Sequence, residues 1–330
     1  MIKEAVPVGV MLTLSMLVQS CLYDGIRDCS DYYNSLYIDN HWNLAPDADP
    51  EGMAAFFFKK DGSGVWRFDL VGKDGGQVRL PMGDYAFVTL NDDTAVQFED
   101  TGSYESMFLS TASCALFPGA TDSGGEEMSV RMISPEEETV MCPETIWYDS
   151  SPCVSLSLDR LSYVDISEGE KIRVSPFLIL PAHPRSIVCK YHLVVTGVSN
   201  LEGVSRVSAA ISGMAGQIKI DGLSRPCQGV TLPFPVKCSG GSGINGEFLT
   251  FGLTSDPSVR NILSLFVWLA DGTRHCYEFD VTSQTTTADD PMDVWIRIDG
   301  LELPVSAENK GSFDVTVDKW NTIVINLGGS

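Results

Sequence analysis

Cys21 and the residues before it are the clearest chemical signal in the sequence. Lys3 is followed by the apolar stretch of residues 5–18, whose end overlaps the tetrapeptide Val18-Gln19-Ser20-Cys21. A helix of this length reaches only about 21 Å at ~1.5 Å per residue, which is short of the ~30 Å hydrocarbon core of a membrane. Residues 1–20 are therefore predicted to be a signal peptide rather than a membrane span.

The tetrapeptide fits a bacterial lipobox, with an apolar residue three positions before the cysteine and a small residue directly before it. In such a motif the thiol of Cys21 takes a diacylglycerol, the chain is cut after Ser20, and the new N-terminus is acylated with a fatty acid such as palmitate. Two or more acyl chains anchor a protein stably where a single chain does not. The alternative is an ordinary secretory signal that leaves Cys21 as a free thiol.

Eight cysteines remain once Cys21 is assigned to lipid, an even number in a compartment that permits disulfides. They are Cys29, Cys114, Cys142, Cys153, Cys189, Cys227, Cys238 and Cys276. Two local pairs suit the ends of a hairpin or loop and are the candidate disulfides: Cys142 with Cys153, and Cys227 with Cys238. The alternative is that most of the eight are buried free thiols that behave as small hydrophobes.

Metal and catalytic motifs are weak. No C-x-x-C pair occurs and the four histidines are scattered, so a structural zinc site is not expected. The acidic run 47–51 lacks the glycine-centred spacing of a calcium loop, and Glu136, Glu137 and Glu138 are consecutive, as in a solvated loop. No Gly-x-Ser-x-Gly or phosphate-binding loop is found in its required context. The sequence therefore predicts no enzyme, no metal and no cofactor.

Two of the six tryptophans could form a platform on which a sugar stacks. Trp42 and Trp320 lie next to polar residues, whereas the other four, such as Trp268, lie within apolar runs and are expected in the core. His41 is expected to pack or to lie on the surface rather than to act in catalysis. The formal net charge of −22 further limits the classes of partner that the protein can bind, because it repels phosphate backbones and anionic lipids. Nucleic acid is therefore excluded as a partner.

The body of the chain is predicted to be all-β, because short β-rich runs alternate with Gly, Asp, Asn, Ser and Pro clusters. In Val294–Asp299 apolar and other residues alternate, which predicts one buried and one wetter face. Residues 239–243 are interpreted as a hairpin loop. The expected strands are 53–58, 65–70, 77–80, 85–90, 95–99, 107–111, 128–133, 145–148, 171–180, 191–198, 204–211, 217–220, 246–253, 263–269, 277–282, 294–298, 313–317 and 322–327.

The region of residues 150–170 is the best place to divide the chain. The predicted organisation is a signal peptide at 1–20, an N-terminal β-sandwich domain at 21–166 and a C-terminal β-sandwich domain at 167–330.

Several short motifs resemble FimB-type fimbrial anchor subunits and related fimbrillin-like lipoproteins of Bacteroides-like bacteria. The start of the mature chain is similar, with a lipid cysteine, a Tyr-Asp step and a second cysteine at residues 21–29. Further similar segments are 50–53, 76–85, 195–198, 211–215 and 313–320. The chain departs from the family in its extra cysteines and in the lack of an acidic pair after Cys21.

This resemblance implies two transthyretin-like (Ig-like) β-sandwich domains and an outer-membrane lipoprotein at the cell surface. Such subunits join other fimbrial subunits by strand addition, and residues 313–327 are the natural strand to donate. The simpler interpretation of those residues is that they finish the second sandwich. The functional hypothesis is a lipid-anchored structural or adhesive fimbrial subunit. The alternative is a surface glycan-binding lipoprotein of a polysaccharide-uptake system, with a glycan as partner.

Overall fold

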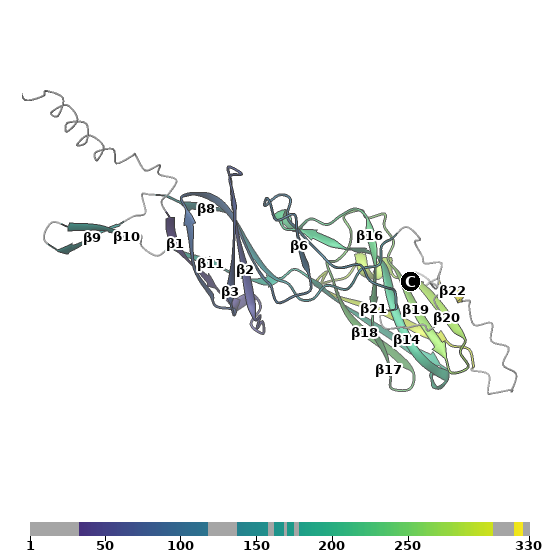
Figure 1. Ribbon diagram of the computed structural model, residues 1–330. Coiled ribbons are helices and arrows are strands. Elements are labelled where there is room, and N and C mark those ends of the chain that lie inside the picture. Colours follow the sequence, from purple (N-terminus) through teal and green to yellow (C-terminus); the bar gives the residue numbers. More distant parts are fainter. Residues whose placement is uncertain are drawn as a thin grey trace, which may run out of the picture.

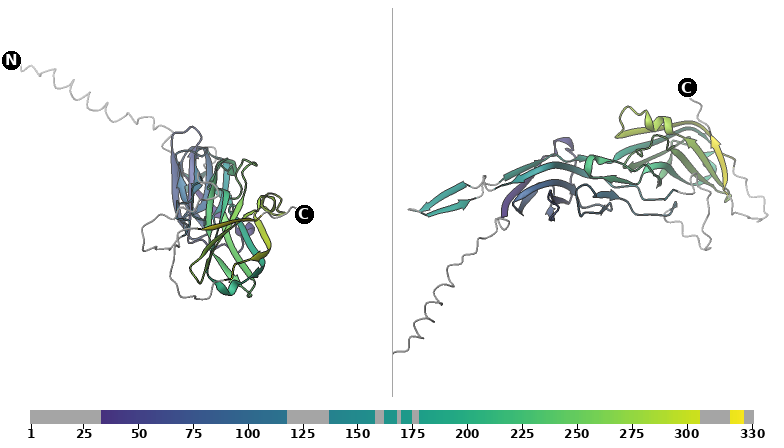
Figure 2. Two further views of the ribbon diagram at one scale, coloured as in Figure 1. Left: turned by 90° about the vertical axis from the view of Figure 1, so that its right-hand side faces the viewer. Right: turned by 90° about the horizontal axis from the view of Figure 1, so that it is seen from above.

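The structure is a computed structural model, and it describes residues 33–117, 137–157, 162–167, 170–174, 178–305 and 320–325. The strands gather into two lobes that lie end to end, so the molecule is elongated (Figure 1, Figure 2). The helical segments among these residues are short. They are η2 (Trp42–Leu44), η4 (Leu201–Gly203), η5 (Asp221–Leu223) and α2 (Thr282–Thr286).

The first lobe is a sandwich of two sheets. Its strands are β1 (Tyr33–Asn40), β2 (Gly52–Lys59), β3 (Val65–Val71), β4 (Gly75–Pro81), β5 (Gly83–Asn91), β8 (Trp147–Leu156), β11 (Leu178–Ala182) and β12 (Arg185–Ser186). One sheet has the order β11-β1-β4 and the other β12-β8-β5-β2-β3. Leu36 and Ile38 of β1 pack with Phe57 of β2 and Phe87 of β5 in the buried cluster between them.

β2 is buried on both faces, which explains its continuous apolar sequence. Ala55 and Phe57 enter the cluster under β1, while Phe56 and Phe58 enter a second cluster on the opposite face. The turn that follows β2 needs a positive φ, and Gly62 supplies it at +74°.

A small sheet of order β15-β7-β6 covers that opposite face. Its strands are β6 (Gln97–Glu99), β7 (Phe108–Ser110) and β15 (Gln217–Lys219). Leu109 of β7 and Ile218 of β15 pack in one buried cluster with Phe56 and with Phe251. Segments from both halves of the sequence therefore share a core where the lobes meet.

The second lobe is also a sandwich. Its strands are β13 (Cys189–Ser199), β14 (Val204–Ala215), β16 (Gly229–Phe234), β17 (Val236–Ser239), β18 (Gly243–Thr250), β19 (Ile262–Leu269), β20 (Arg274–Asp280), β21 (Asp293–Glu302) and β22 (Asn321–Ile325). The sheets have the orders β17-β18-β13-β21 and β16-β14-β19-β20-β22. Both edge strands that come last in the sequence pair in parallel, β21 with β13 and β22 with β20.

A two-stranded ribbon of β9 (Ser162–Ser167) and β10 (Glu170–Val174) projects beyond β1 at the end of the first lobe (Figure 1). The predicted domain boundary at residues 166 and 167 falls at the tip of this ribbon. β11 and β12 follow the boundary in sequence, yet they pair with β1 and β8, which precede it.

The all-β prediction is confirmed, and most predicted strands are present within a residue or two of their expected ends. Several expectations need correction. β1, β9, β12, β16 and β17 were not expected, β8 runs through residues placed in the dividing region, and the single strand expected at 171–180 is two strands, β10 and β11. Pro176 lies between the last two, and proline cannot donate to a ladder. The strands expected at 128–133 and 313–317 lie outside the described residues.

Candidate functional site

The predicted lipidation site, Cys21, lies outside the described residues together with the signal peptide and Cys29. Among the residues that the structure describes, no helix is both long and apolar enough to cross a membrane. The assignment of Cys21 therefore stays a prediction.

The candidate disulfides are not bonded in the structure, where Cys142, Cys153, Cys227 and Cys238 are all free thiols. Cys142 donates its Sγ–H to the carbonyl oxygen of Pro233 at 3.4 Å. Cys142 precedes β8 (Trp147–Leu156), whereas Cys153 lies six residues into that strand, about 20 Å from its start at ~3.3 Å per residue. A disulfide needs Cα atoms within about 7 Å of each other.

The second pair is separated by a change of sheet. Cys227 precedes β16 and its sulfur lies 3.3 Å from the hydroxyl oxygen of Ser255, whereas Cys238 lies on β17. β16 and β17 belong to different sheets of the second lobe, and facing sheets lie about 10 Å apart. The hairpin that the spacing suggested is a crossover between layers.

Trp42 and Trp320 do not come together, because they lie in different lobes. The Trp42 indole nitrogen donates to the carbonyl oxygen of Lys73 at 2.9 Å, and its ring meets Trp147 edge-on. Trp320 stacks on Phe117 and packs edge-on against Trp268 on the outer face of the β19–β20 pair. Both rings are thus used in packing.

The acidic residues considered as ligands are also used locally. Asp49 pairs with Lys73 at 3.1 Å, and the carboxylate of Glu137 accepts hydrogen bonds from the Gly213 amide and the Thr231 hydroxyl, both at 3.2 Å. His41 pairs with Asp39 at 3.1 Å. Within the described ranges, no group of three or more His, Cys, Asp or Glu side chains could hold a metal ion.

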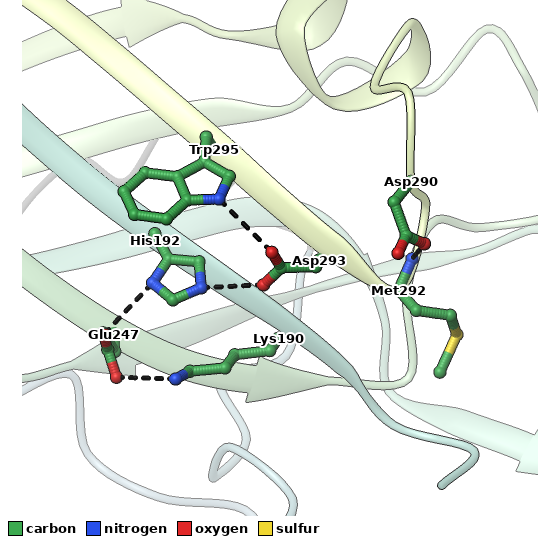
Figure 3. A network of polar contacts seen from close by, with 7 residues as sticks. All are labelled: Lys190, His192, Glu247, Asp290, Met292, Asp293 and Trp295. Carbon is green, nitrogen blue, oxygen red and sulfur yellow. Dashed lines mark hydrogen bonds and ion pairs between the residues drawn. The ribbon is translucent and has the colours of Figure 1, made fainter. Parts of the chain in front are cut away.

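A different cluster stands out on the outer face of the β17-β18-β13-β21 sheet. His192 of β13 lies opposite Glu247 of β18 on one side and Trp295 of β21 on the other. The rings of His192 and Trp295 stack with their centroids 4.2 Å apart and their planes 11° apart. Figure 3 shows how these side chains from three neighbouring strands meet.

Both ring nitrogens of His192 face a carboxylate. Nδ1 lies 3.1 Å from Glu247 and Nε2 lies 2.8 Å from Asp293. Lys190 bonds the second oxygen of Glu247 at 3.0 Å, and the Trp295 indole nitrogen donates to the second oxygen of Asp293 at 3.3 Å (Figure 3). The imidazole is buried, so it cannot turn freely, and the network fixes Trp295 above the sheet.

The network also keeps its acids ionised. The hydrogen bond from Lys190 lowers the pKa of Glu247 below its usual value, with attraction to Lys190 and His192 adding to the effect. The hydrogen bond from His192 lowers the pKa of Asp293 in the same way. Both carboxylates are therefore hydrogen-bond acceptors at neutral pH.

An open groove of about 650 Å³ runs across this face. Its lining includes Trp295, His192 and Val194, together with Lys237, Asn245 and Glu247 from the two outer strands. Volumes of this size are typical of small-ligand sites.

Trp295 was expected in the core and is instead 42% exposed. The alternation in Val294–Asp299 already contained the signal, because it puts Trp295 on the same face as Asp293 and Arg297. His192 and Glu247 had no comparable signal, since only the pairing of β13 with β18 brings them together.

The fold and the surface site define an all-β protein of two sandwiches with a groove on one outer sheet face. The chain belongs to the family described as "Domain of unknown function (DUF5119)", which matches residues 27–234.

A protein of Bacteroides ovatus named "Putative fimbrium anchoring subunit Fim4B" is 24% identical over 94% of this chain and 94% of its own length. The predicted resemblance to fimbrial anchor subunits is thereby confirmed. A crystal structure described as a "putative adhesin" from Bacteroides ovatus matches 94% of this chain and all of its own chain, with 20% identity and a TM-score of 0.62. The fimbrial anchor protein Mfa2 of Porphyromonas gingivalis matches 81% of this chain and 91% of its own, with 14% identity and a TM-score of 0.48. These names describe structural and adhesive proteins, not enzymes.

Proposed function

We propose that this chain is a lipid-anchored structural subunit of fimbriae, in an anchor or accessory position, and that it joins partner subunits by β-strand addition. The observation that carries the proposal is the match to a relative named as a fimbrium anchoring subunit over 94% of both chains. The sequence match covers both lobes, so it includes both sandwiches and not one of them alone.

The arrangement of the molecule supports an anchoring role. β1, the first described strand, lies in one lobe, while β22 lies at the far side of the other (Figure 1, Figure 2). A lipid at Cys21 would hold the end that bears β1 at the outer membrane. The end that bears β22 would then point away from it, toward other subunits at the cell surface.

Membrane attachment is tested by Cys21→Ala, which removes the thiol that would carry lipid. We expect the wild-type protein in the membrane fraction and the variant in the soluble fraction. Cys29→Ala is the matched control, since it removes a nearby thiol outside the lipobox and is expected to stay with the membrane. A Cys21→Ala protein that still sediments with membranes would contradict the anchor.

β22 is the candidate for strand exchange. It is a five-residue edge strand paired only with β20 among the described strands, and Ile323 and Val324 are 41% and 66% exposed. Only Ile325 packs against the core of the second lobe. An edge strand that buries so little can leave at low cost and expose the backbone of β20 to a strand of a partner.

Deletion of residues 321–330 tests this exchange. A folded monomer that no longer assembles into fimbriae would support donation of β22. Loss of folding would support the simpler interpretation, in which β22 only completes the second sandwich. A peptide of residues 320–330 added to the truncated protein is expected to bind if the β20 edge has been left open.

A glycan-binding lipoprotein was the alternative prediction from Trp42 and Trp320. Both of those rings pack against other aromatic side chains. A glycan-binding role would therefore need another aromatic residue.

A further inference from the structure

Trp295 has the exposure and rigidity of a stacking surface. It is 42% exposed on a strand whose alternate residues Val294 and Ile296 are fully buried. Its indole nitrogen is held by Asp293, one neighbour is the stacked ring of His192, and the guanidinium carbon of Arg297 lies 5.3 Å from its ring centre. The ring is thus ordered before any ligand arrives, which reduces the entropy that binding costs.

The groove beside Trp295 crosses four neighbouring strands, β21, β13, β18 and β17. At ~4.8 Å between strands this distance is about 14 Å, long enough for a short chain of rings rather than a single small molecule. The volume of about 650 Å³ agrees with a ligand of that size.

Polar groups along the groove are both donors and acceptors. Lys237 donates, Glu247 accepts, and the side-chain amide of Asn245 can do both. Asn245 is oriented by a hydrogen bond of 2.9 Å from its amide nitrogen to the hydroxyl of Ser239. Such a mixed set suits hydroxyl groups, each of which also donates and accepts.

We propose that this groove binds a neutral oligosaccharide, with Trp295 as the surface on which one sugar ring stacks. The apolar C–H face of a sugar ring covers the face of the indole opposite His192, from which the exposed Arg297 side chain moves aside, while its hydroxyls bond Asn245, Glu247 and Lys237 around the edge. The proposal does not rest on the fimbrial function, because the groove lies on a sheet face and uses neither β22 nor Cys21.

Charge selects a neutral glycan over an anionic one. The chain carries a formal net charge of −22, and the two carboxylates next to Trp295 are kept ionised by Lys190 and His192. The side chains of Lys190 and His192 are already in contact with Glu247 and Asp293. Lys237 in the groove and Arg297 beside Trp295 are further positive side chains on this face, and they do not outweigh the two carboxylates and the negative net charge, which repel sialylated or sulfated chains.

The test is a binding screen of the mature, full-length protein. The probes are cellohexaose, maltohexaose, mannohexaose, xylohexaose and lacto-N-tetraose, with 3′-sialyllactose and a heparin hexasaccharide as anionic probes. We expect at least one neutral probe to bind in calorimetric titration and both anionic probes to fail. Binding of no neutral probe, or tighter binding of an anionic one, would overturn the proposal.

Variants locate the site. Trp295→Ala is expected to weaken binding of the neutral probe at least about tenfold, which corresponds to about 1.4 kcal/mol. Asn245→Ala is expected to weaken it less.

Trp42→Ala is the matched control, because it removes an indole from the other lobe and is expected to leave the affinity unchanged. Circular dichroism checks that each variant is folded, and Trp295→Phe, which keeps a smaller ring, is expected to bind with intermediate affinity. Equal binding by wild type and Trp295→Ala would exclude this groove.

Discussion

His192 is the residue on which the surface cluster depends, because it contacts every strand of the cluster at once. Its ring nitrogens reach Glu247 on β18 and Asp293 on β21, and its ring face covers Trp295. The polar contact at each nitrogen fixes the plane of the imidazole, and the stacked indole is held parallel to that plane. One buried side chain therefore determines how an exposed aromatic residue is presented.

The two acids should make the stability of the fold depend on pH. Because the pKa values of Glu247 and Asp293 are lowered in the folded state, their contribution is fully present above their unfolded values of 4.5 and 3.8 and is lost as pH falls through the folded values. We expect the double variant Glu247→Gln, Asp293→Asn to unfold more easily than wild type at pH 7. The difference should shrink below about pH 4. Urea titrations at several pH values measure it.

Glu202→Gln is the control for this experiment, since it neutralises an exposed carboxylate on η4 outside the cluster. Its effect is expected to be small at every pH. A gap between wild type and the double variant that stays constant down to pH 3 would contradict the assignment.

Cysteine reactivity should follow burial. Burial raises the pKa of Cys142 to about 12 and that of Cys276 to about 12, and only the thiolate reacts with iodoacetamide. Cys153 and Cys227 are exposed. At pH 8 we expect mass spectrometry of the native, unreduced protein to find alkylation at Cys153 and Cys227 well before Cys142 and Cys276. Peptides joined by a bond between Cys142 and Cys153 would contradict the structure and restore the disulfide predicted from spacing.

At the scale of the elements, the edge of β21 is protected by a side chain rather than by a strand. β21 pairs only with β13 among the described strands. On its other side, the side-chain amide of Gln284 in α2 accepts from the Arg297 amide at 2.7 Å and donates to the Arg297 carbonyl at 3.0 Å. Gln284 thus imitates one residue of a neighbouring strand, and it leaves less of the edge open to another chain.

Gln284→Ala should open this edge. The variant loses two hydrogen bonds, and we expect the free energy of unfolding to fall by about 1–2 kcal/mol, at roughly 1 kcal/mol for each bond. The exposed edge should also raise the tendency to associate, which analytical ultracentrifugation at increasing concentration measures. Ser283→Ala, an exposed neighbour on α2, is the control. A Gln284→Ala protein that is as stable and as monomeric as wild type would show that α2 does not protect β21.

Local sequence patterns predicted most of the strands but not the partners with which they pair. Met53–Phe58 and Val65–Leu70 match β2 and β3 because a Gly-rich turn joins them. By contrast, β1 was missed, and its partner β11 lies more than a hundred residues away in the sequence. No short-range pattern encodes such a pairing, and the same limit hid the meeting of His192, Glu247 and Trp295. The spacing of Cys227 and Cys238 suggested a hairpin in the same way, whereas β16 and β17, the strands next to them, lie in different sheets.

At the scale of the whole molecule, the two lobes are joined by shared core rather than by a linker. Phe56 of β2 and Leu109 of β7 pack in one cluster with Ile218 of β15 and with Phe251 after β18. β15 also pairs with β7 along three residues. Neither lobe can lose this cluster without exposing apolar surface of the other. The division into residues 21–166 and 167–330 remains a prediction. Because this cluster contains residues from both predicted domains, the two domains are expected to depend on each other for stability.

Thermal unfolding distinguishes coupled lobes from independent ones. If the shared cluster couples them, calorimetry of the mature chain should show one transition, and Ile218→Ala should shift all of it. Ile218 is fully buried, so its truncation is expected to cost about 2–5 kcal/mol. Val71→Ala is the control, because Val71 is 94% exposed and a surface change of this kind costs less than about 0.5 kcal/mol. Two transitions, of which Ile218→Ala moves only one, would mean that the sandwiches fold separately and that the contact between β7 and β15 does not couple them. A single transition would instead mean that the two lobes unfold as one cooperative unit.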